Sequence, residues 1–241
     1  MKKTIAIACV ATFAMLTLGA LTSCNDSSDE LTDSHITKYA VLTMYGNEVE
    51  SVAVGTSYTD AGCSAVLGGE DYTDHINIVG LDEIDVNTIG LYTIVYSAVN
   101  TEGFYATKTR TVIVYDPAIT ADLSGTWTTS EGSYRLYNGN PVAFSGYTVE
   151  LNPVAGGIYE ISDLLGGWYA QRAGYGSNYA MSGYINLTAD NTIEVLSGYV
   201  PGWGDTYTEA YEGTYDPDRE TLDFAVLYTD YNFIFNVVLK K

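Results

Sequence analysis

The stretch 91-LYTIVYSAVNTEGFYATKTRTVIVYDP-117 decides the fold of this chain. Residues 91–99 alternate like a β-strand with two different faces. One face would carry Tyr92, Ile94, Tyr96 and Ala98, and the other Thr93, Val95, Ser97 and Val99. Residues 100–103 end in Gly103, which is free to take a positive φ, so they predict a loop before a second strand at 104–115. The stretch therefore predicts an antiparallel hairpin.

Other β-rich runs precede this hairpin and indicate one all-β domain. They are rich in Val, Ile, Thr and Tyr and lie at 39–44, 49–54, 62–67 and 76–79. Turn residues separate the runs at 46–47, 68–69 and 87–90. Short antiparallel strands at this regular spacing predict a sandwich that ends near Asp116-Pro117.

Three segments of this half carry a family resemblance. Residues 54–62 read VGTSYTDAG, residues 87–96 read NTIGLYTIVY, and residues 109–114 read TRTVIV. Together they resemble a bacterial immunoglobulin-like family. The resemblance covers residues 36–117 and implies an immunoglobulin-like β-sandwich that acts as a spacer or adhesion unit. Asn100 stands where that family usually has an acidic residue, so the sequence does not carry over a bound cation.

The second half, residues 118–241, contains all three tryptophans and most of the tyrosines. Its strand candidates are 125–130, 133–137, 146–151, 158–161, 167–171, 181–187, 192–196, 208–215, 221–228 and 231–239. So many short strands, with no helical period between them, predict an antiparallel β-barrel or a strongly curved sheet, which removes exposed edges.

Residues 123–127, LSGTW, resemble the glycine-x-tryptophan opening of lipocalin-like barrels. In that family the tryptophan closes one end of the barrel and an arginine near the C-terminus stacks on it. This chain has only Lys240 and Lys241 there. We therefore expect Trp127 to be a core residue.

The N-terminus has the layout of a secretory signal at residues 1–23. Lys2 and Lys3 precede a short apolar run, and small residues lead to Cys24. The ending LTSC resembles the lipobox of bacterial lipoproteins, which implies that Cys24 is acylated and begins the mature chain. Residues 24–35 are polar and acidic, which predicts a flexible tether. They also resemble the surface-export signal of Bacteroidetes-type lipoproteins, which implies an outer-membrane lipid anchor with the protein facing the cell exterior.

The charge and the cysteines exclude several classes of protein. A net charge of −20 argues against nucleic acid as a partner, because binding it needs a basic face. The cysteines are Cys9, Cys24 and Cys63, so once the first is cleaved off and the second acylated no internal disulfide can form. Cys63, between small residues, is expected to be a small buried hydrophobe.

The sequence offers no catalytic residues and no cofactor. Its two histidines, His35 and His75, have no zinc-ligand spacing and no nucleophile motif beside them. We therefore expect a protein that is not an enzyme.

A calcium site is the one metal candidate. Asp216, Asp218 and Glu220 alternate across a turn and would supply hard oxygen ligands. A tight turn set by Pro217, with its charges in solvent, explains the same residues and is the favoured interpretation.

Two glycine-rich segments, 164–179 and 198–207, are dense in aromatic rings. Rings held in loops offer flat apolar faces and polar edges, on which sugars and peptide side chains stack. The candidate ligand-binding residues are Trp168, Tyr169, Arg172, Tyr175, Tyr199 and Trp203. The alternative is that these rings fill the barrel core or its mouth.

The whole mature chain resembles a family of Bacteroidetes outer-membrane lipoproteins of unassigned function. Members are associated with SusC/SusD-like nutrient importers. The resemblance implies an accessory binding component that captures an oligosaccharide or a peptide for such a transporter complex. Two alternatives remain: a structural lipoprotein that docks a protein partner without its own ligand, and a surface hydrolase that uses paired carboxylates.

Overall fold

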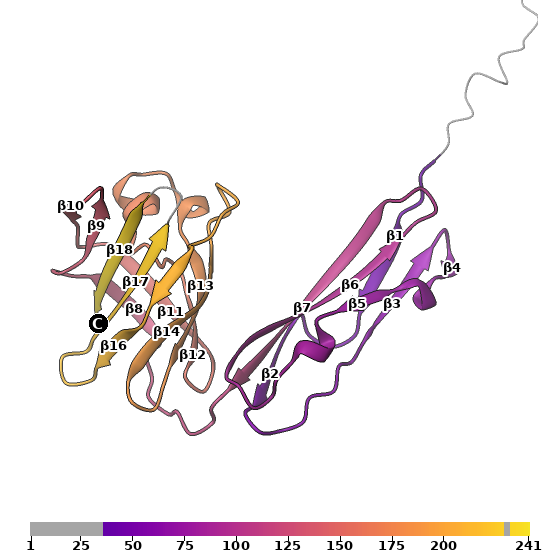
Figure 1. The fold of residues 1–241 in the computed structure, drawn as a ribbon, viewed down its shortest axis with the longest axis horizontal. Coiled ribbons are helices and arrows are strands. Elements are labelled where there is room, and N and C mark those ends of the chain that lie inside the picture. Colours follow the sequence, from indigo (N-terminus) through magenta and orange to yellow (C-terminus); the bar gives the residue numbers. More distant parts are fainter. Residues whose placement is uncertain (1–35, 229–231) are drawn as a thin grey trace, which may run out of the picture. The chain divides into compact units, whose positions relative to one another are not determined.

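The computed structural model describes residues 36–228 and 232–241. The expected signal peptide (1–23), the tether (24–35) and the lipidation site at Cys24 lie outside the described residues. Nearly every regular element in the described ranges is a β-strand (Figure 1), which confirms the all-β prediction. In that part of the chain, no helix is long and apolar enough to cross a membrane.

The strands between residues 40 and 115 form two sheets. The first has the order β1 (Ala40–Met44), β3 (Cys63–Leu67) and β4 (Glu70–Asp71). The second has the order β2 (Val49–Ala53), β7 (Tyr105–Tyr115), β6 (Gly90–Val99) and β5 (Asn77–Val79), and short 3-10 turns lie at η2 (Thr73–His75) and η3 (Leu81–Glu83). The predicted sandwich is present, but β2 runs parallel to β7, which corrects the expectation of purely antiparallel pairing.

The hairpin that the sequence predicts is β6 and β7, paired over ten residues from Gly90↔Val114 to Val99↔Tyr105. Ile94, Tyr96 and Ala98 are buried as expected for one face of an alternating strand. Asn100 closes the loop, because its Oδ1 accepts the backbone N–H groups of Glu102 at 3.0 Å and Phe104 at 2.8 Å. The side chain at this position therefore shapes the turn.

A buried charge lies within this sandwich. The Arg110 side chain is fully buried, and its guanidinium forms an ion pair with Asp60 and donates to the backbone carbonyl of Tyr45. It also donates from Nε to the carbonyl of Asn47 at 3.1 Å. Arg110 thus joins strand β7 to the loop that follows β1.

Two tyrosine hydroxyls complete this network. Tyr96 donates to Asp60 at 2.7 Å, and Tyr58 donates to Glu50 at 2.9 Å. Burial raises the pKa of Tyr58 to about 12. Tyr58 and Asp60 belong to the segment that carries the immunoglobulin-like resemblance, so the structure gives that pattern a physical reason: its polar members surround Arg110.

The strands after residue 125 close into an eight-stranded antiparallel barrel. Around the ring the order is β8 (Gly125–Thr129), β11 (Thr148–Ala155), β12 (Ile158–Ile161), β13 (Ser182–Leu187), β14 (Thr192–Tyr199), β16 (Gly213–Asp216), β17 (Thr221–Tyr228) and β18 (Phe233–Lys240). The ring closes because β18 pairs with both β17 and β8. A hairpin of β9 (Tyr134–Tyr137) and β10 (Asn140–Ala143) extends from β18, and β15 (Glu209–Tyr211) pairs with β17. The barrel alternative of the fold prediction is therefore confirmed.

Trp127 lies inside the barrel with no exposed surface, as expected for a core residue. Its indole Nε1 donates to the carbonyl of Leu123 at 2.7 Å, and the ring of Tyr215 meets it edge-on. Lys241 Nζ lies 5.7 Å from the centre of the indole ring, within the range of a cation–π contact. A cation near the C-terminus thus lies over the ring of this core tryptophan.

Two sequence expectations need correction. Residues 167–171 are not a strand, because Gly166 and Gly167 take φ values of 61° and 83°, and the chain turns into the short π-helix η4 (Trp168–Arg172). Cys63 is half-buried rather than fully buried, since it lies on β3, and burial raises the pKa of its thiol.

Candidate functional site

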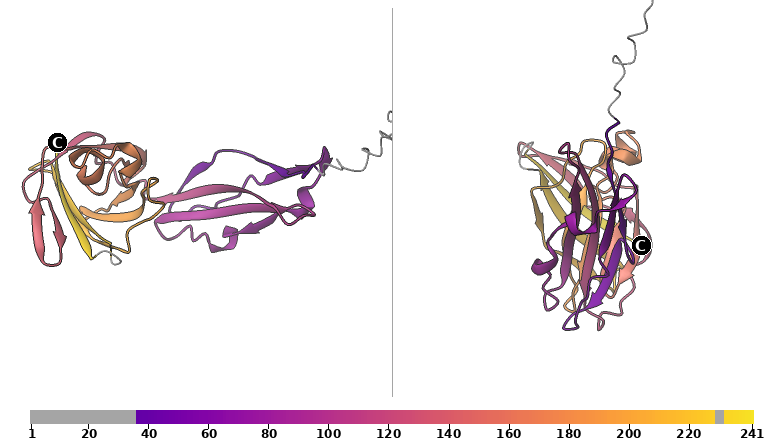
Figure 2. Two further views of the ribbon diagram at one scale, coloured as in Figure 1. Left: turned by 90° about the horizontal axis from the view of Figure 1, so that it is seen from above. Right: turned by 90° about the vertical axis from the view of Figure 1, so that its right-hand side faces the viewer.

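The connection from β12 to β13, residues 162–181, covers one end of the barrel (Figures 1 and 2). It contains η4 and the 3-10 turn η5 (Ser177–Tyr179). The carboxylate of Asp163 holds the connection together. It accepts the backbone N–H groups of Leu165 at 2.9 Å, Gly167 at 3.0 Å and Met181 at 3.1 Å. One buried side chain thus fixes both ends of the connection, and with them the turns between.

Asp163 is 2% exposed, and burial raises its pKa to about 6, against the three hydrogen bonds that lower it. In the unfolded chain an aspartate titrates near 3.9. The folded state therefore holds the proton more tightly, and the stability linked to this group is present below pH ~4 and is lost as the pH rises through ~6.

Asp163→Asn should lower the free energy of unfolding at pH 4 by about 1–3 kcal/mol, because the amide NH₂ would face a backbone N–H that now donates to Oδ2. The loss should be smaller at pH 7, because the neutral amide also removes the cost of burying the charged carboxylate. Between pH 4 and pH 7, the free energy of unfolding of the variant should also lose the pH dependence that the Asp163 carboxyl causes in the wild type. Urea denaturation at both pH values measures this. Asp218→Asn, in an exposed turn, is the control, and equal pH profiles for wild type and Asp163→Asn would contradict the assignment.

Four aromatic rings from two loops gather at this end of the barrel. This aromatic cluster consists of Tyr169, Tyr175, Tyr179 and Trp203. The indole of Trp203 lies 4.7 Å from the ring of Tyr169 and 5.1 Å from that of Tyr179, both edge-on. Tyr175 is 56% exposed and Trp203 43% exposed. The cluster thus combines mutual packing with ring surface that faces solvent.

Backbone contacts hold the two loops of the cluster together. The N–H of Gly202 donates to the carbonyl of Asn178 at 2.7 Å. A Cβ on Gly202 would come within 2.7 Å of the Tyr179 ring, so a larger residue would push the loops apart. The cluster is therefore a fixed surface built from residues 169–179 and 200–204.

Trp168 and Arg172 do not belong to this surface, which corrects the sequence expectation. Trp168 is 4% exposed and packs edge-on against Phe144 and Phe235 in the barrel core. The guanidinium carbon of Arg172 lies 4.1 Å from the centre of the Trp168 ring, and that of Arg135 lies 4.6 Å away. Arg172 therefore covers the ring of a core residue.

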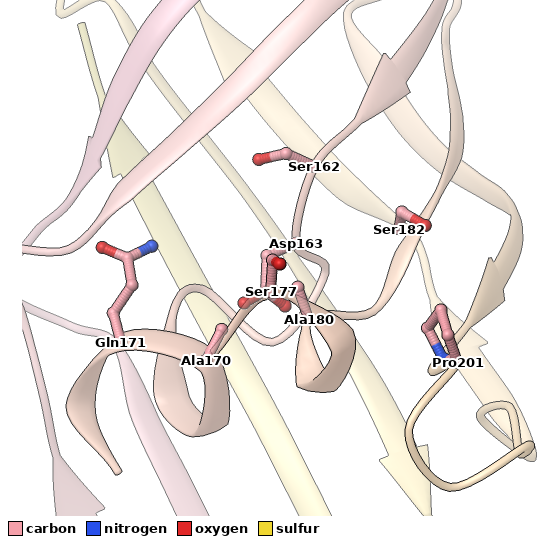
Figure 3. A pocket seen from close by; sticks show the side chains of 8 residues that line it. All are labelled: Ser162, Asp163, Ala170, Gln171, Ser177, Ala180, Ser182 and Pro201. Atoms are coloured by element: carbon pink, nitrogen blue, oxygen red, sulfur yellow. The ribbon is translucent and has the colours of Figure 1, made fainter. Parts of the chain in front are cut away.

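Two surface concavities lie beside the cluster. The first has a volume of about 290 Å³ and is lined by Ser162, Asp163, Ala170, Gln171, Ser177, Ala180, Ser182 and Pro201 (Figure 3). The second has a volume of about 320 Å³ and is lined by Glu160, Ser182, Gly183, Tyr184, Ser197, Gly198 and Tyr199. Tyr199 is 51% exposed and lines this second concavity. The predicted ligand residues thus divide between the core, the aromatic cluster and the second concavity.

The acidic turn forms no metal site in the structure. Asp216 Oδ1 accepts the backbone N–H groups of Asp218 at 3.0 Å and Arg219 at 3.1 Å. Within residues 36–228 and 232–241, no three side chains of His, Cys, Asp or Glu lie close enough to hold an ion. Asp216 therefore shapes the turn, while Glu220 takes a positive φ of 49° beside it.

Sequence reasoning missed three residues of this region. Tyr179 is the last residue of the first aromatic segment, and the density of aromatic residues in that segment is a signal that could have identified it. The sequence carries no signal for Asp163 or Ser182, because their contacts depend on chain segments that only the closed barrel brings together.

Comparisons with known proteins fit this architecture. A family model described as a bacterial surface protein Ig-like domain matches residues 42–114, and a model for a C-terminal domain matches residues 116–241. The crystal structure of the lipoprotein BT2262 from Bacteroides thetaiotaomicron has 41% sequence identity over 84% of this chain and 100% of that chain, with a TM-score of 0.48. This chain belongs to the family of that lipoprotein. The membership confirms the resemblance to bacterial surface lipoproteins in which an immunoglobulin-like domain precedes a tyrosine-rich β domain.

Two further solved structures are similar to this chain at low sequence identity. The M60 catalytic domain with two CBM51 domains from Clostridium perfringens ZmpB is 15% identical over 84% of this chain and 21% of that chain, with a TM-score of 0.28. CBM51-2 with INT domains of the same protein, in complex with GlcNAc, is 12% identical over 83% of this chain and 43% of that chain, with a TM-score of 0.26. No curated protein matches this chain. At TM-scores of 0.28 and 0.26, neither of these two structures supports a functional argument for this chain.

Proposed function

We propose that this lipoprotein is an accessory binding component of a SusC/SusD-like importer. In this proposal acyl chains on Cys24 anchor it in the outer membrane, where it faces the cell exterior and captures an oligosaccharide or a peptide. Two or more acyl chains suffice for a stable anchor. The observation that carries the proposal is the aromatic cluster, whose solvent-facing rings lie on the same two loops as Ala170, Ser177 and Pro201 of the first concavity.

The arrangement favours binding over hydrolysis. A glycosidase needs one free carboxylate as acid and another as base or nucleophile. Asp163 is the carboxylate in the first concavity, and both of its oxygens accept backbone N–H groups. Exposed rings, in contrast, gain from ligand stacking without any further reaction.

Trp203→Ala should weaken capture at least ten-fold, because the indole contacts three other rings of the cluster and presents a face to solvent. Cells that display the full-length lipoprotein would be incubated with a fluorescent pool of plant-polysaccharide oligosaccharides and with a fluorescent casein digest. The retained fluorescence is the measurement.

Tyr105→Ala is the matched control, since this ring is 70% exposed but lies on β7 of the immunoglobulin-like domain. It should leave retention unchanged. Absence of retention of both pools by the wild type, or equal retention by wild type and Trp203→Ala, would refute the proposed function.

A further inference from the structure

Two concavities on the barrel surface meet at Ser182, which lines both of them. The first also includes Ala170 and Pro201, which directly adjoin Tyr169 and the Trp203 loop in the chain. The two neighbouring concavities are here called the Ser182 groove. The groove begins beside the loops that carry the aromatic cluster and reaches the outer face of β13. A ligand held by the cluster therefore lies next to a hollowed part of the barrel wall.

Strand register lines the far part of the groove with rings and hydroxyls. Ser182 lies opposite Tyr199, and Tyr184 lies opposite both Glu160 and Ser197. Between these rows Gly183 faces Gly198. A Cβ on Gly183 would lie 1.9 Å from the carbonyl oxygen of Ser197, so β13 and β14 approach this closely only because glycine is there.

Four hydroxyl groups of this wall are available to a ligand. Those of Ser182, Tyr184, Ser197 and Tyr199 form no hydrogen bond with any other described residue (36–228 and 232–241). Each is both a donor and an acceptor, which matches the hydroxyl groups of a sugar. The exposed face of Tyr199 adds a surface on which a pyranose ring can stack.

The charge of the groove selects against anions. Its lining includes the carboxylates of Asp163 and Glu160 but neither lysine nor arginine. Two cations at this end of the barrel, Arg172 and Arg135, both lie over the ring of Trp168. A uronate or sulfated sugar over the groove lining would meet the like charge of Glu160 and Asp163, which lowers its affinity relative to a neutral sugar.

The backbone of the groove does not suit an extended peptide. Peptides commonly bind by adding a strand to an open sheet edge. Here β12 and β13 are each paired on both sides within the closed barrel, whereas β14 pairs with β16 only at Thr192 and Ile193. Recognition over β12 and β13 must therefore use side chains, and those present are mainly hydroxyls and rings.

We infer that the Ser182 groove binds a neutral oligosaccharide, with one part against the aromatic cluster and the next across Ser182 toward Tyr199. This inference rests on the proposed function and names its ligand class. Because two neighbouring concavities are filled in turn, affinity should rise with the number of sugar units up to about four.

Isothermal titration of the detergent-solubilised lipoprotein tests the inference. The probes are cellotetraose, xylotetraose, mannotetraose and their disaccharides, tetragalacturonate, and a casein digest. At least one neutral tetrasaccharide should bind ten-fold more tightly than its disaccharide and than tetragalacturonate.

Ser182→Tyr, which fills both concavities, should weaken that binding at least ten-fold, while Ser51→Tyr, on an exposed position of β2, should not. Glu160→Gln should reduce, at least three-fold, the ratio of the affinity for the neutral tetrasaccharide to the affinity for tetragalacturonate.

Three results would overturn the inference. Tighter binding of tetragalacturonate, or of casein peptides only, would refute the ligand class and leave capture by the aromatic cluster intact. Neutral-sugar binding that is lost in Trp203→Ala but unchanged in Ser182→Tyr would refute the groove and keep the proposed function. Failure of every probe to bind would refute both.

Discussion

Arg110→Ala should lower the free energy of unfolding of the immunoglobulin-like domain by about 3–5 kcal/mol, because it leaves a buried carboxylate without its cation. The Asp60 side chain is only 7% exposed, so water cannot replace the guanidinium. The carbonyls of Tyr45 and Asn47 lose their donor in the same step. The variant therefore combines an unpaired buried charge with the loss of two hydrogen bonds to the backbone.

Hydrogen exchange at the amides of β6 and β7 measures this loss within the correct domain, since all three tryptophans lie in the barrel and their fluorescence reports only on that half. Lys108→Ala is the matched control. Lys108 lies 3.7 Å from Glu48 with side-chain exposures of 45% and 73%, so its loss should cost less than about 1 kcal/mol. If Arg110→Ala and Lys108→Ala lowered the free energy of unfolding by similar amounts, the stabilising role of the buried Arg110 network would be contradicted.

The double variant Arg110→Met with Asp60→Asn separates charge from packing. A buried ion pair replaced by neutral groups of similar size often costs little, whereas breaking one half is strongly destabilising. We expect the double variant to recover most of the stability that Arg110→Ala loses. A loss as large as that of the single variant would show that hydrogen bonds to the backbone, and not the unpaired charge, dominate.

The hairpin and this network show what sequence can and cannot predict. Residues 91–99 reveal their buried face directly, because strand periodicity alone assigns Ile94 and Tyr96 to one side. The partner of Asp60 lies 50 residues away at Arg110. That contact depends on β2 pairing in parallel with β7, and local pattern does not determine long-range pairing.

The barrel shows the same division between local and tertiary information. The number and type of strands follow from β-rich runs and turn residues, which are local signals. The burial of the two loop tryptophans, Trp168 and Trp203, does not follow from local signals. Both have glycine neighbours, yet Trp168 is 4% and Trp203 43% exposed. The positive φ values of Gly166 and Gly167 turn the chain so that the first indole enters the core, and only barrel closure creates the space it fills.

Trp168→Ala should therefore lower the free energy of unfolding of the barrel by about 3–5 kcal/mol, the usual cost of removing a large buried aromatic side chain. The indole packs edge-on against Phe144 at 5.2 Å and Phe235 at 6.1 Å between ring centres. It also receives the guanidinium groups of Arg135 and Arg172, and each such contact adds about 0.5–2 kcal/mol. Urea denaturation followed by far-UV circular dichroism measures the loss.

Trp203→Ala provides the contrast on the same barrel. Its ring is 43% exposed, so its removal should cost no more than about 1–2 kcal/mol of stability while it weakens capture at least ten-fold. Trp168→Phe keeps a ring against Phe144 and Phe235 and should recover more than half of the stability lost in Trp168→Ala. Because η4 carries both Trp168 and Tyr169, a loosened core would also displace the aromatic cluster. Equal destabilisation by the two alanine variants would show that Trp168 does not anchor this turn, and the fixed geometry of the cluster would then need another source.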